Sequence, residues 1–242
     1  MTPEDADHVE ARSEWLELLA AATDRVLTSL RAAVDALEEP SRLPGWTRAH
    51  VATHLARNAD SFTWMLDGAA AGEQREQYPG GPATRAAAID AGSRRPGVEV
   101  VSDVRRAAER FSAACTRMPE AAWSFPVLAS AGEVPAAYLI WARLREVEVH
   151  HTDLGLRYAP ADWPGAFIDA ELPRRLDALA DRLPRGTAAR VVRVPDGEVR
   201  EAGAGPASLA VSGPGYALLA WLLGRDATGL DAPGGLPPLA AW

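Results

Sequence analysis

Residues 141–155 read WARLREVEVHHTDLG, and this stretch decides how the first part of the chain folds. Polar and apolar side chains form separate stripes along it at helical spacing, which predicts a helix from about Glu133 to Gly155. Side chains four residues apart lie on the same face of a helix, so Glu146 and His150 can both reach one metal ion. The stretch therefore predicts a helix that carries two metal ligands.

A third ligand has to come from another segment. His54 lies far upstream, in the helical stretch LPGWTRAHVATHLARNAD (43–60), and ligands from two facing helices are typical of a metal site inside a helix bundle. Two imidazoles and one carboxylate suit zinc, and three protein ligands leave a fourth position open. His54, Glu146 and His150 are therefore the candidate zinc ligands, and the open position indicates chemistry.

Spacing leaves two rival ligand pairs open. His50 and His54 are four residues apart, and Glu148 and His151 are three apart. His151 falls on a neighbouring, mostly apolar stripe, so we expect it to pack in the core. Glu146 and His150 are also consistent with a charge pair along one helix, worth about 0.2 to 0.5 kcal/mol. His50 and His54 are also consistent with a half-buried helix on which one ring caps or hydrogen-bonds and the other faces solvent.

Three more helical segments precede residues 141–155. The patterns predict helices over 4–38, from an N-cap at Thr47 to about 67, and over 98–118. Between them, residues 72–97 are rich in Gly, Pro and Arg and indicate a long loop that contains a short helix. Four long helices in succession favour a bundle.

The pattern changes after residue 162. A helix over 167–183 is followed by RVVRVPDGEVREAG (190–203), whose β-branched residues flank a Pro-Asp-Gly turn and predict a hairpin. SLAVSG (208–213) predicts a strand, and PGYALLAWLLGR (214–225) a helix with its Pro in the first turn. We expect Trp242, at the end of a Pro- and Gly-rich tail, to pack back on the body.

These segments predict an α+β protein of two domains, a helix bundle over 1–158 and a small α+β domain over 159–242. The formal net charge of -8, from 33 acidic and 25 basic residues, argues against a nucleic-acid partner. No apolar run approaches the roughly 18 residues of a membrane span, and the polar, acidic N-terminus does not resemble a signal peptide. We expect a cytoplasmic monomer.

Two single residues need separate interpretation. Cys115 is the only cysteine, lies in an amphipathic helical pattern and has no His or Asn beside it, so we expect a buried structural thiol. Arg225 follows an apolar helix at a Gly-bearing turn. Arg225 is either a cation at a helix C-terminus, which stabilises the helix by roughly 0.3 to 1 kcal/mol, or a residue that binds a carboxylate with two hydrogen bonds.

Several of these segments together resemble one family, the mycothiol-dependent maleylpyruvate isomerases, which belong to the wider group of DinB-like metal-binding bundles. The matching pieces run in the family's order along nearly the whole chain. They are LPGWTRAHVATHLARNAD (43–60), QYPGGPATRAAAIDAGS (77–93), WARLREVEVHHTDLG (141–155), VSGPGYALLAWLLGR (211–225) and GLPPLAAW (235–242).

The resemblance implies a DinB-like four-helix bundle followed by an α+β domain similar to sterol carrier proteins, with the active site between them. It implies that His54, Glu146 and His150 bind zinc. It also places Arg225 in the active site as a catalytic, anion-binding and cofactor-binding residue, with Arg85 as a second candidate for the same work.

The implied reaction is cis-trans isomerisation by reversible thiol addition. Adding a thiolate across a conjugated cis double bond leaves a single bond that rotates, and elimination returns the trans isomer. Because Cys115 is a poor nucleophile, we expect an external low-molecular-weight thiol, which the resemblance identifies as mycothiol. The expected reaction converts maleylpyruvate, a small anion, to fumarylpyruvate in gentisate degradation.

Two other functions fit the same residues. One is a mycothiol S-transferase or a tailoring isomerase of the same superfamily that acts on another electrophile. The other is a non-catalytic zinc-containing protein whose α+β module binds an apolar ligand. An open fourth zinc position favours the enzymes, and four protein ligands would favour the binding protein.

Overall fold

The computed structural model describes residues 3–129, 132–205 and 207–240, with side chains from residue 11 onward. The chain forms two compact units, Met1–Tyr158 and Ala159–Trp242. The fold class is α+β, as the sequence predicts. No helix in the described ranges is both long enough and apolar enough to cross a bilayer.

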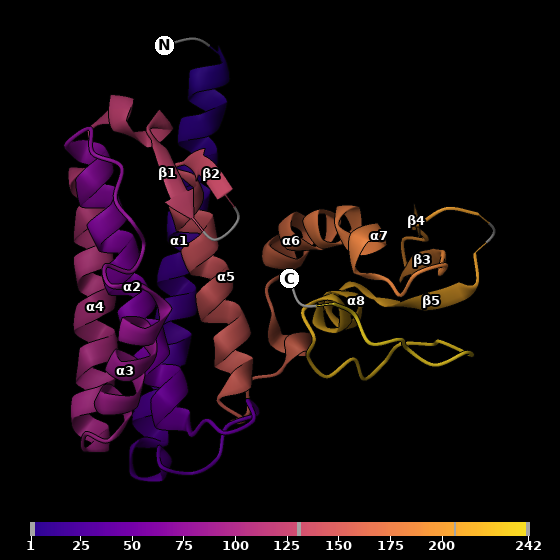
Figure 1. Cartoon of the computed structure of the whole chain (residues 1–242), viewed down its shortest axis with the longest axis horizontal. Coiled ribbons are helices and arrows are strands. Elements are labelled where there is room, and N and C mark those ends of the chain that lie inside the picture. The colour runs from indigo at the N-terminus through magenta and orange to yellow at the C-terminus, as the bar shows by residue number, and fades with distance from the viewer. Residues whose placement is uncertain (1–2, 130–131, 206, 241–242) are drawn as a thin grey trace. The chain divides into compact units, whose positions relative to one another are not determined.

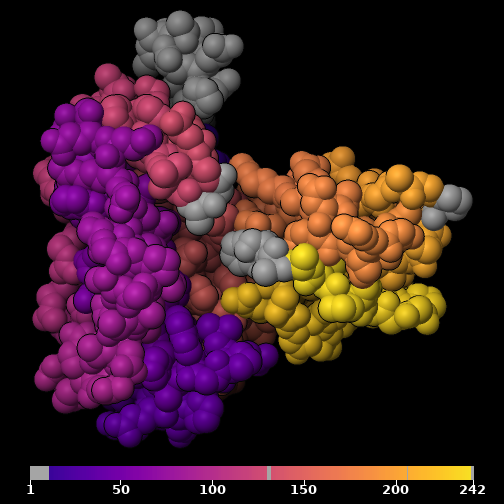
Figure 2. All heavy atoms as spheres, in the orientation of Figure 1, coloured from indigo at the N-terminus to yellow at the C-terminus, as the bar shows by residue number. Residues whose placement is uncertain are grey.

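The first unit is built on four long helices that lie side by side (Figure 1). Helix α2 packs against α4 and α5, and α1 packs against α5 and more loosely against α4. A shorter helix, α3, covers α2 and lies beside it on the visible face of the molecule (Figure 2). The long helices are α1 (Pro3–Ala32), α2 (Arg48–Ala70), α4 (Gly97–Arg117) and α5 (Tyr138–Asp153), and α3 spans Gly81–Ser93.

Helix α2 begins where the sequence predicts. Thr47 is its N-cap, and the Thr47 side chain accepts a hydrogen bond from the backbone N–H of His50. The Thr47 N–H donates in return to Nδ1 of His50 at 3.2 Å, which completes a capping box. This reciprocal pair fixes the start of the helix that carries His54.

The first helix is shorter than the sequence pattern predicts. Helix α1 ends at Ala32, and a 3-10 turn, η1 (Val34–Ala36), replaces the rest of the predicted segment 4–38. This turn packs closely against the start of α4: a Cβ built on Gly97 would lie 2.2 Å from the carbonyl oxygen of Val34. Glycine at the start of α4 lets the two backbones approach this closely.

The predicted start of the last bundle helix is wrong. Glu133 lies in a short hairpin of β1 (Pro126–Ala129) and β2 (Gly132–Pro135), and α5 begins only at Tyr138. Pro135 cannot donate a backbone hydrogen bond within a helix and favours extended structure in the residue before it. The hairpin follows a short 3-10 segment, η2 (Glu120–Ser124).

Buried ion pairs add polar contacts to the apolar core of the bundle. The Asp103 carboxylate on α4 accepts hydrogen bonds from Arg57 on α2 at 2.9 Å and from Arg95 at 2.6 Å. Burial alone would raise the pKa of Asp103, but the two guanidinium groups outweigh it and lower the pKa. Asp103 therefore stays ionised and helps to hold α4 against α2.

The second unit places helices beside a three-stranded sheet of order β4-β3-β5. Strands β3 and β4 form the predicted antiparallel hairpin, and β5 pairs in parallel with β3. The predicted helix over 167–183 is divided at Ala178, and Pro214 is the N-cap of α8 and not part of its first turn. The expectation for Trp242 falls outside the described residues.

The elements of this unit are η3 (Pro160–Asp162), α6 (Gly165–Asp177), α7 (Leu179–Arg182), β3 (Ala189–Val194), β4 (Val199–Ala202), β5 (Leu209–Pro214) and α8 (Gly215–Leu222).

Candidate metal centre

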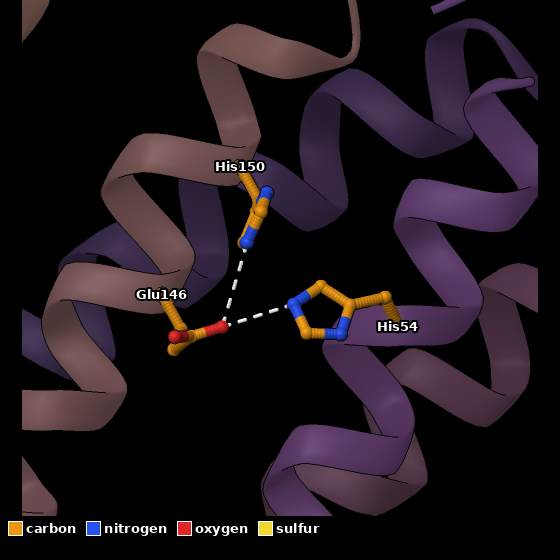
Figure 3. A group of neighbouring side chains, drawn as sticks. All are labelled: His54, Glu146 and His150. Carbon is orange, nitrogen blue, oxygen red and sulfur yellow. Dashed lines mark hydrogen bonds and ion pairs between the residues drawn. The ribbon is translucent and has the colours of Figure 1, made fainter. Parts of the chain in front are cut away.

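His54, Glu146 and His150 converge inside the bundle (Figure 3). Each residue offers one potential ligand atom, a ring nitrogen or a carboxylate oxygen, and these three atoms lie within 4.8 Å of one another. Oε2 of Glu146 is 2.9 Å from Nε2 of His54 and 3.5 Å from Nε2 of His150. This is the one such group of three or more His, Cys, Asp or Glu residues among the described side chains.

The helices account for this convergence. On α5, Glu146 and His150 are one turn apart and project from the same face, and α2 presents His54 to that face (Figure 3). The two imidazole rings meet edge to face with centroids 4.4 Å apart. Three donors from two packed helices are thus held in place without help from a loop.

Burial and mutual contact set the charges of the group. Burial, followed by the nearby His150, lowers the pKa of His54 to about 4 despite the contact with Glu146, so this ring is neutral at pH 7. Burial would raise the pKa of Glu146, but hydrogen bonds from His150 and His54 hold it well below its usual value. A neutral imidazole and a carboxylate are the states that bind metal ions.

Asp153 orients the third member of the group. Its Oδ2 lies 2.8 Å from Nδ1 of His150, and the Asp153 side chain is almost fully buried. Burial lowers the pKa of His150, but Asp153 and Glu146 outweigh that effect and raise it. A carboxylate on the far nitrogen of a metal-binding histidine fixes the ring and its tautomer. The sequence interpretation gave Asp153 no role, although its spacing of three from His150 was a usable signal.

Arg85 approaches the group from α3. Its Nη2 lies 3.0 Å from Nδ1 of His54, and its guanidinium carbon lies 5.3 Å from the ring centre of Tyr78. Because arginine only donates, Nδ1 of His54 accepts, and the proton of the neutral ring sits on Nε2, facing Glu146. A metal ion on Nε2 would require that proton to move to Nδ1, where it would face Arg85 donor to donor. The Arg85 contact thus fits the tautomer whose proton is on Nε2.

His50, from the first rival pair, takes part in the N-terminal cap of α2 and not in the metal-binding group. Its Nδ1 closes the capping box with Thr47, and its Nε2 lies 3.9 Å from the exposed carboxylate of Asp90. His50 is not in the group of three that the structure brings together. His50 therefore lies four residues before His54 because it serves the cap at the start of α2, and not because both bind one metal ion.

Glu148 and His151, the second rival pair, lie in a separate buried network. Glu148 accepts hydrogen bonds from Arg25 at 2.6 Å and from the hydroxyl of Tyr158. His151 contacts Ser29 at 2.8 Å and stacks on the ring of Tyr158. The structure thus places His151 in the packing role that its stripe predicts.

Arg225 lies beyond the C-terminus of α8 in the second unit. Its Nη1 donates to the carbonyl of Leu223 at 2.6 Å. It lines a cavity of about 380 Å³ together with Arg182, Trp221 and the tail segment 237–240. Nε1 of Trp221 is buried there without a hydrogen-bond partner in the described part of the chain. Two arginines thus line the cavity, and their positive charge suits an anion.

Comparison with known proteins identifies the family. The model for the mycothiol maleylpyruvate isomerase N-terminal domain matches residues 15–155, more than half of the chain. The chain belongs to the mycothiol maleylpyruvate isomerase family. No curated protein sequence matches it significantly.

Solved structures of the family cover both units. A crystal structure of the mycothiol-dependent maleylpyruvate isomerase is similar with a TM-score of 0.88 and 26% sequence identity, over 96% of this chain and 97% of that one. A structure of a His-to-Ala mutant of that enzyme has a TM-score of 0.87, with the same identity and coverage. The similarity extends well beyond the bundle.

Cys115 lies on α4 and is buried, and burial raises the pKa of its thiol to about 12. We expect iodoacetamide to alkylate it at pH 8 at least about a hundredfold more slowly in the folded than in the denatured chain, because the thiolate is the reactive form. Mass spectrometry of timed samples measures both rates. Similar rates would mean that Cys115 is an accessible thiol and a candidate nucleophile.

Proposed function

We propose that this protein is a zinc- and mycothiol-dependent isomerase that converts maleylpyruvate to fumarylpyruvate, a step of gentisate degradation. The observation that carries the proposal is the group of His54, Glu146 and His150, in a chain of the mycothiol maleylpyruvate isomerase family. The similarity to an enzyme of that name over nearly the full length of both chains supports it.

The three donors fit zinc in number and kind. Two imidazole nitrogens and a carboxylate oxygen form a ligand set found in catalytic zinc sites, which keep one position for water or substrate. His54 is 4% exposed, and Asp153 supports His150 from behind, as in metal sites whose ligands are preorganised. Bound there, zinc would supply a Lewis acid that lowers the pKa of a coordinated thiol or polarises a substrate oxygen.

The chain's own thiol does not fit the reaction. Cys115 is buried, and its pKa of about 12 keeps it protonated at neutral pH. Addition to the cis double bond therefore needs an external thiol, and mycothiol is the thiol in the family's name. Elimination after rotation returns that thiol, so none is consumed.

The substrate is a dianion and needs cationic partners. We assign this work to Arg85 and Arg225. Arg85 already lies at the edge of the metal group, and it loses its hydrogen bond to His54 if that ring binds a metal through Nε2. Arg225 lines a cavity together with a second arginine, Arg182. Guanidinium groups bind carboxylates with two parallel hydrogen bonds and also offset a developing oxyanion.

Turnover of maleylpyruvate, followed by its ultraviolet absorbance, tests the proposal. The zinc-loaded protein should isomerise maleylpyruvate when mycothiol is present and should be inactive without a thiol. Turnover without thiol would contradict the mechanism. Inactivity with mycothiol, but adduct formation with another electrophile, would point to a mycothiol S-transferase.

Metal content tests the ligand assignment. We expect about one zinc per chain, and His54→Ala should lose most of it because one of three ligands is gone. His50→Ala is the matched control, because His50 lies on the same helix but serves the capping box. Elemental analysis of folded samples measures both. Zinc kept in His54→Ala and lost in His50→Ala would reverse the assignment.

Arg225→Ala should lower turnover by roughly a hundredfold to a thousandfold, the usual cost of losing a transition-state hydrogen bond, while zinc content stays unchanged. Arg225→Lys should recover only part, because an ammonium group lacks the bidentate fork. Kinetics and metal analysis on the same preparations measure this. If the turnover of Arg225→Ala stays within a fewfold of that of the wild type, Arg225 is only a helix-end cation. Arg85 is then the next residue to replace.

A further inference from the structure

A second cavity of about 380 Å³ lies in the first unit, apart from the group of metal-binding side chains. It opens along the loosely packed seam between α1 and α4. Its walls come mainly from those two helices and expose more apolar than polar surface, with Leu16, Leu19, Leu27 and Phe111 among the lining residues. Ligand pockets in proteins are commonly of this size and character.

One residue of the lining comes from α5 and lies at the floor of this cavity. Arg143 is only 2% exposed, although it carries a guanidinium group. Its Nη1 donates to Oδ1 of Asn58 at 2.8 Å, and Asn58 is itself buried and neutral. Within the described ranges, no carboxylate lies at ion-pair distance from Arg143.

A buried cation without a counterion is unstable unless something offsets it. The effective cost of burying an unpaired ion is several kcal/mol. Burial lowers the pKa of Arg143 to about 10, and Glu146, Tyr78 and Asp60 offset that effect only in part, so the side chain is still charged at neutral pH. The cavity is therefore a place where a bound anion gains from a charge that the fold compensates only in part.

The shape of the cavity restricts the kind of anion. Its apolar walls suit a hydrocarbon body, and the cation suits a single anionic head. The charges at the mouth largely cancel: Arg105 pairs with Glu109 at 2.7 Å, and Arg31 and Asp24 both line the opening. A small inorganic ion could reach the cation but would leave the apolar walls exposed to water.

We propose that the groove between α1 and α4 binds a small amphiphilic carboxylate, with its head on Arg143 and its apolar body along the two helices. The site is separate from the metal centre but adjoins it. Asn58 follows His54 by one helical turn, and Arg143 precedes Glu146 by about one turn. Two buried polar layers therefore stack along the bundle, one built to hold a cation and the other to hold an anion.

Calorimetric titration of the full-length protein with octanoate tests this proposal. Octylammonium, with the same chain and the opposite charge, and inorganic phosphate, with charge and no chain, are the control probes. We expect octanoate to bind once per chain and both controls to bind at least about tenfold more weakly, a difference of about 1.4 kcal/mol. Zinc content measured before and after titration should not change.

Matched variants locate the binding. Ala20 is exposed and lines the groove, and Ala21 is exposed on the same turn but does not line it. Ala20→Trp should fill the groove and abolish octanoate binding, and Ala21→Trp should leave it unchanged. Arg143→Met, which keeps length and removes charge, should weaken binding at least about tenfold by loss of a charge-assisted contact.

Three results would overturn the proposal. The first is that the wild type does not bind octanoate, which would mean a water-filled cavity. The other two are equal octanoate affinity in Ala20→Trp and Ala21→Trp, or an affinity of the wild type for octylammonium as high as that for octanoate. If Arg143→Met fails to fold, the two alanine variants still decide the matter. None of these outcomes depends on isomerase activity.

Discussion

The carboxylate of Glu146 is the contact on which the interior of the bundle depends. One of its oxygens lies within hydrogen-bond or ion-pair distance of both His54 and His150, and so connects α2 to α5. A buried carboxylate is costly without such partners, and a single partner would leave it undercompensated. Packing of α2 on α5 and the geometry of the metal centre are therefore two aspects of the same constraint.

The neighbouring side chains follow from that constraint. Asp153 holds the outer nitrogen of His150, and Arg85 holds the outer nitrogen of His54, so both rings are fixed from behind. One turn away, Arg143 contacts Asn58 and places a buried positive charge beside the centre. Replacing any of these groups with an apolar one leaves its partner buried and unsatisfied, which is why such networks specify one arrangement of helices.

The sequence was sufficient for features that depend on local spacing. Helical periodicity predicts the four long helices, Thr47 marks the start of α2, and the turn residues predict the hairpin of the second unit. The β1–β2 hairpin was missed because its short strands lack the run of β-branched residues and the Pro-Asp-Gly turn that mark β3 and β4. The end of α1 was missed because no Gly or Pro marks it, and the η1 turn that follows packs on Gly97, a residue distant in sequence.

In the candidate site, too, local spacing predicts some features and tertiary packing decides the others. A spacing of four identified Glu146 with His150, but it equally identified His50 with His54, and only the packing of α2 on α5 separates them. The contact of Arg85 with His54 joins residues 31 apart and could not be derived from spacing. That contact also fixes which nitrogen of His54 carries the proton, because arginine can only donate. If His54 held a metal ion through Nε2, its ring proton would lie on Nδ1 and the hydrogen bond from Arg85 would be lost, which would leave a guanidinium group beside the site for an anionic substrate.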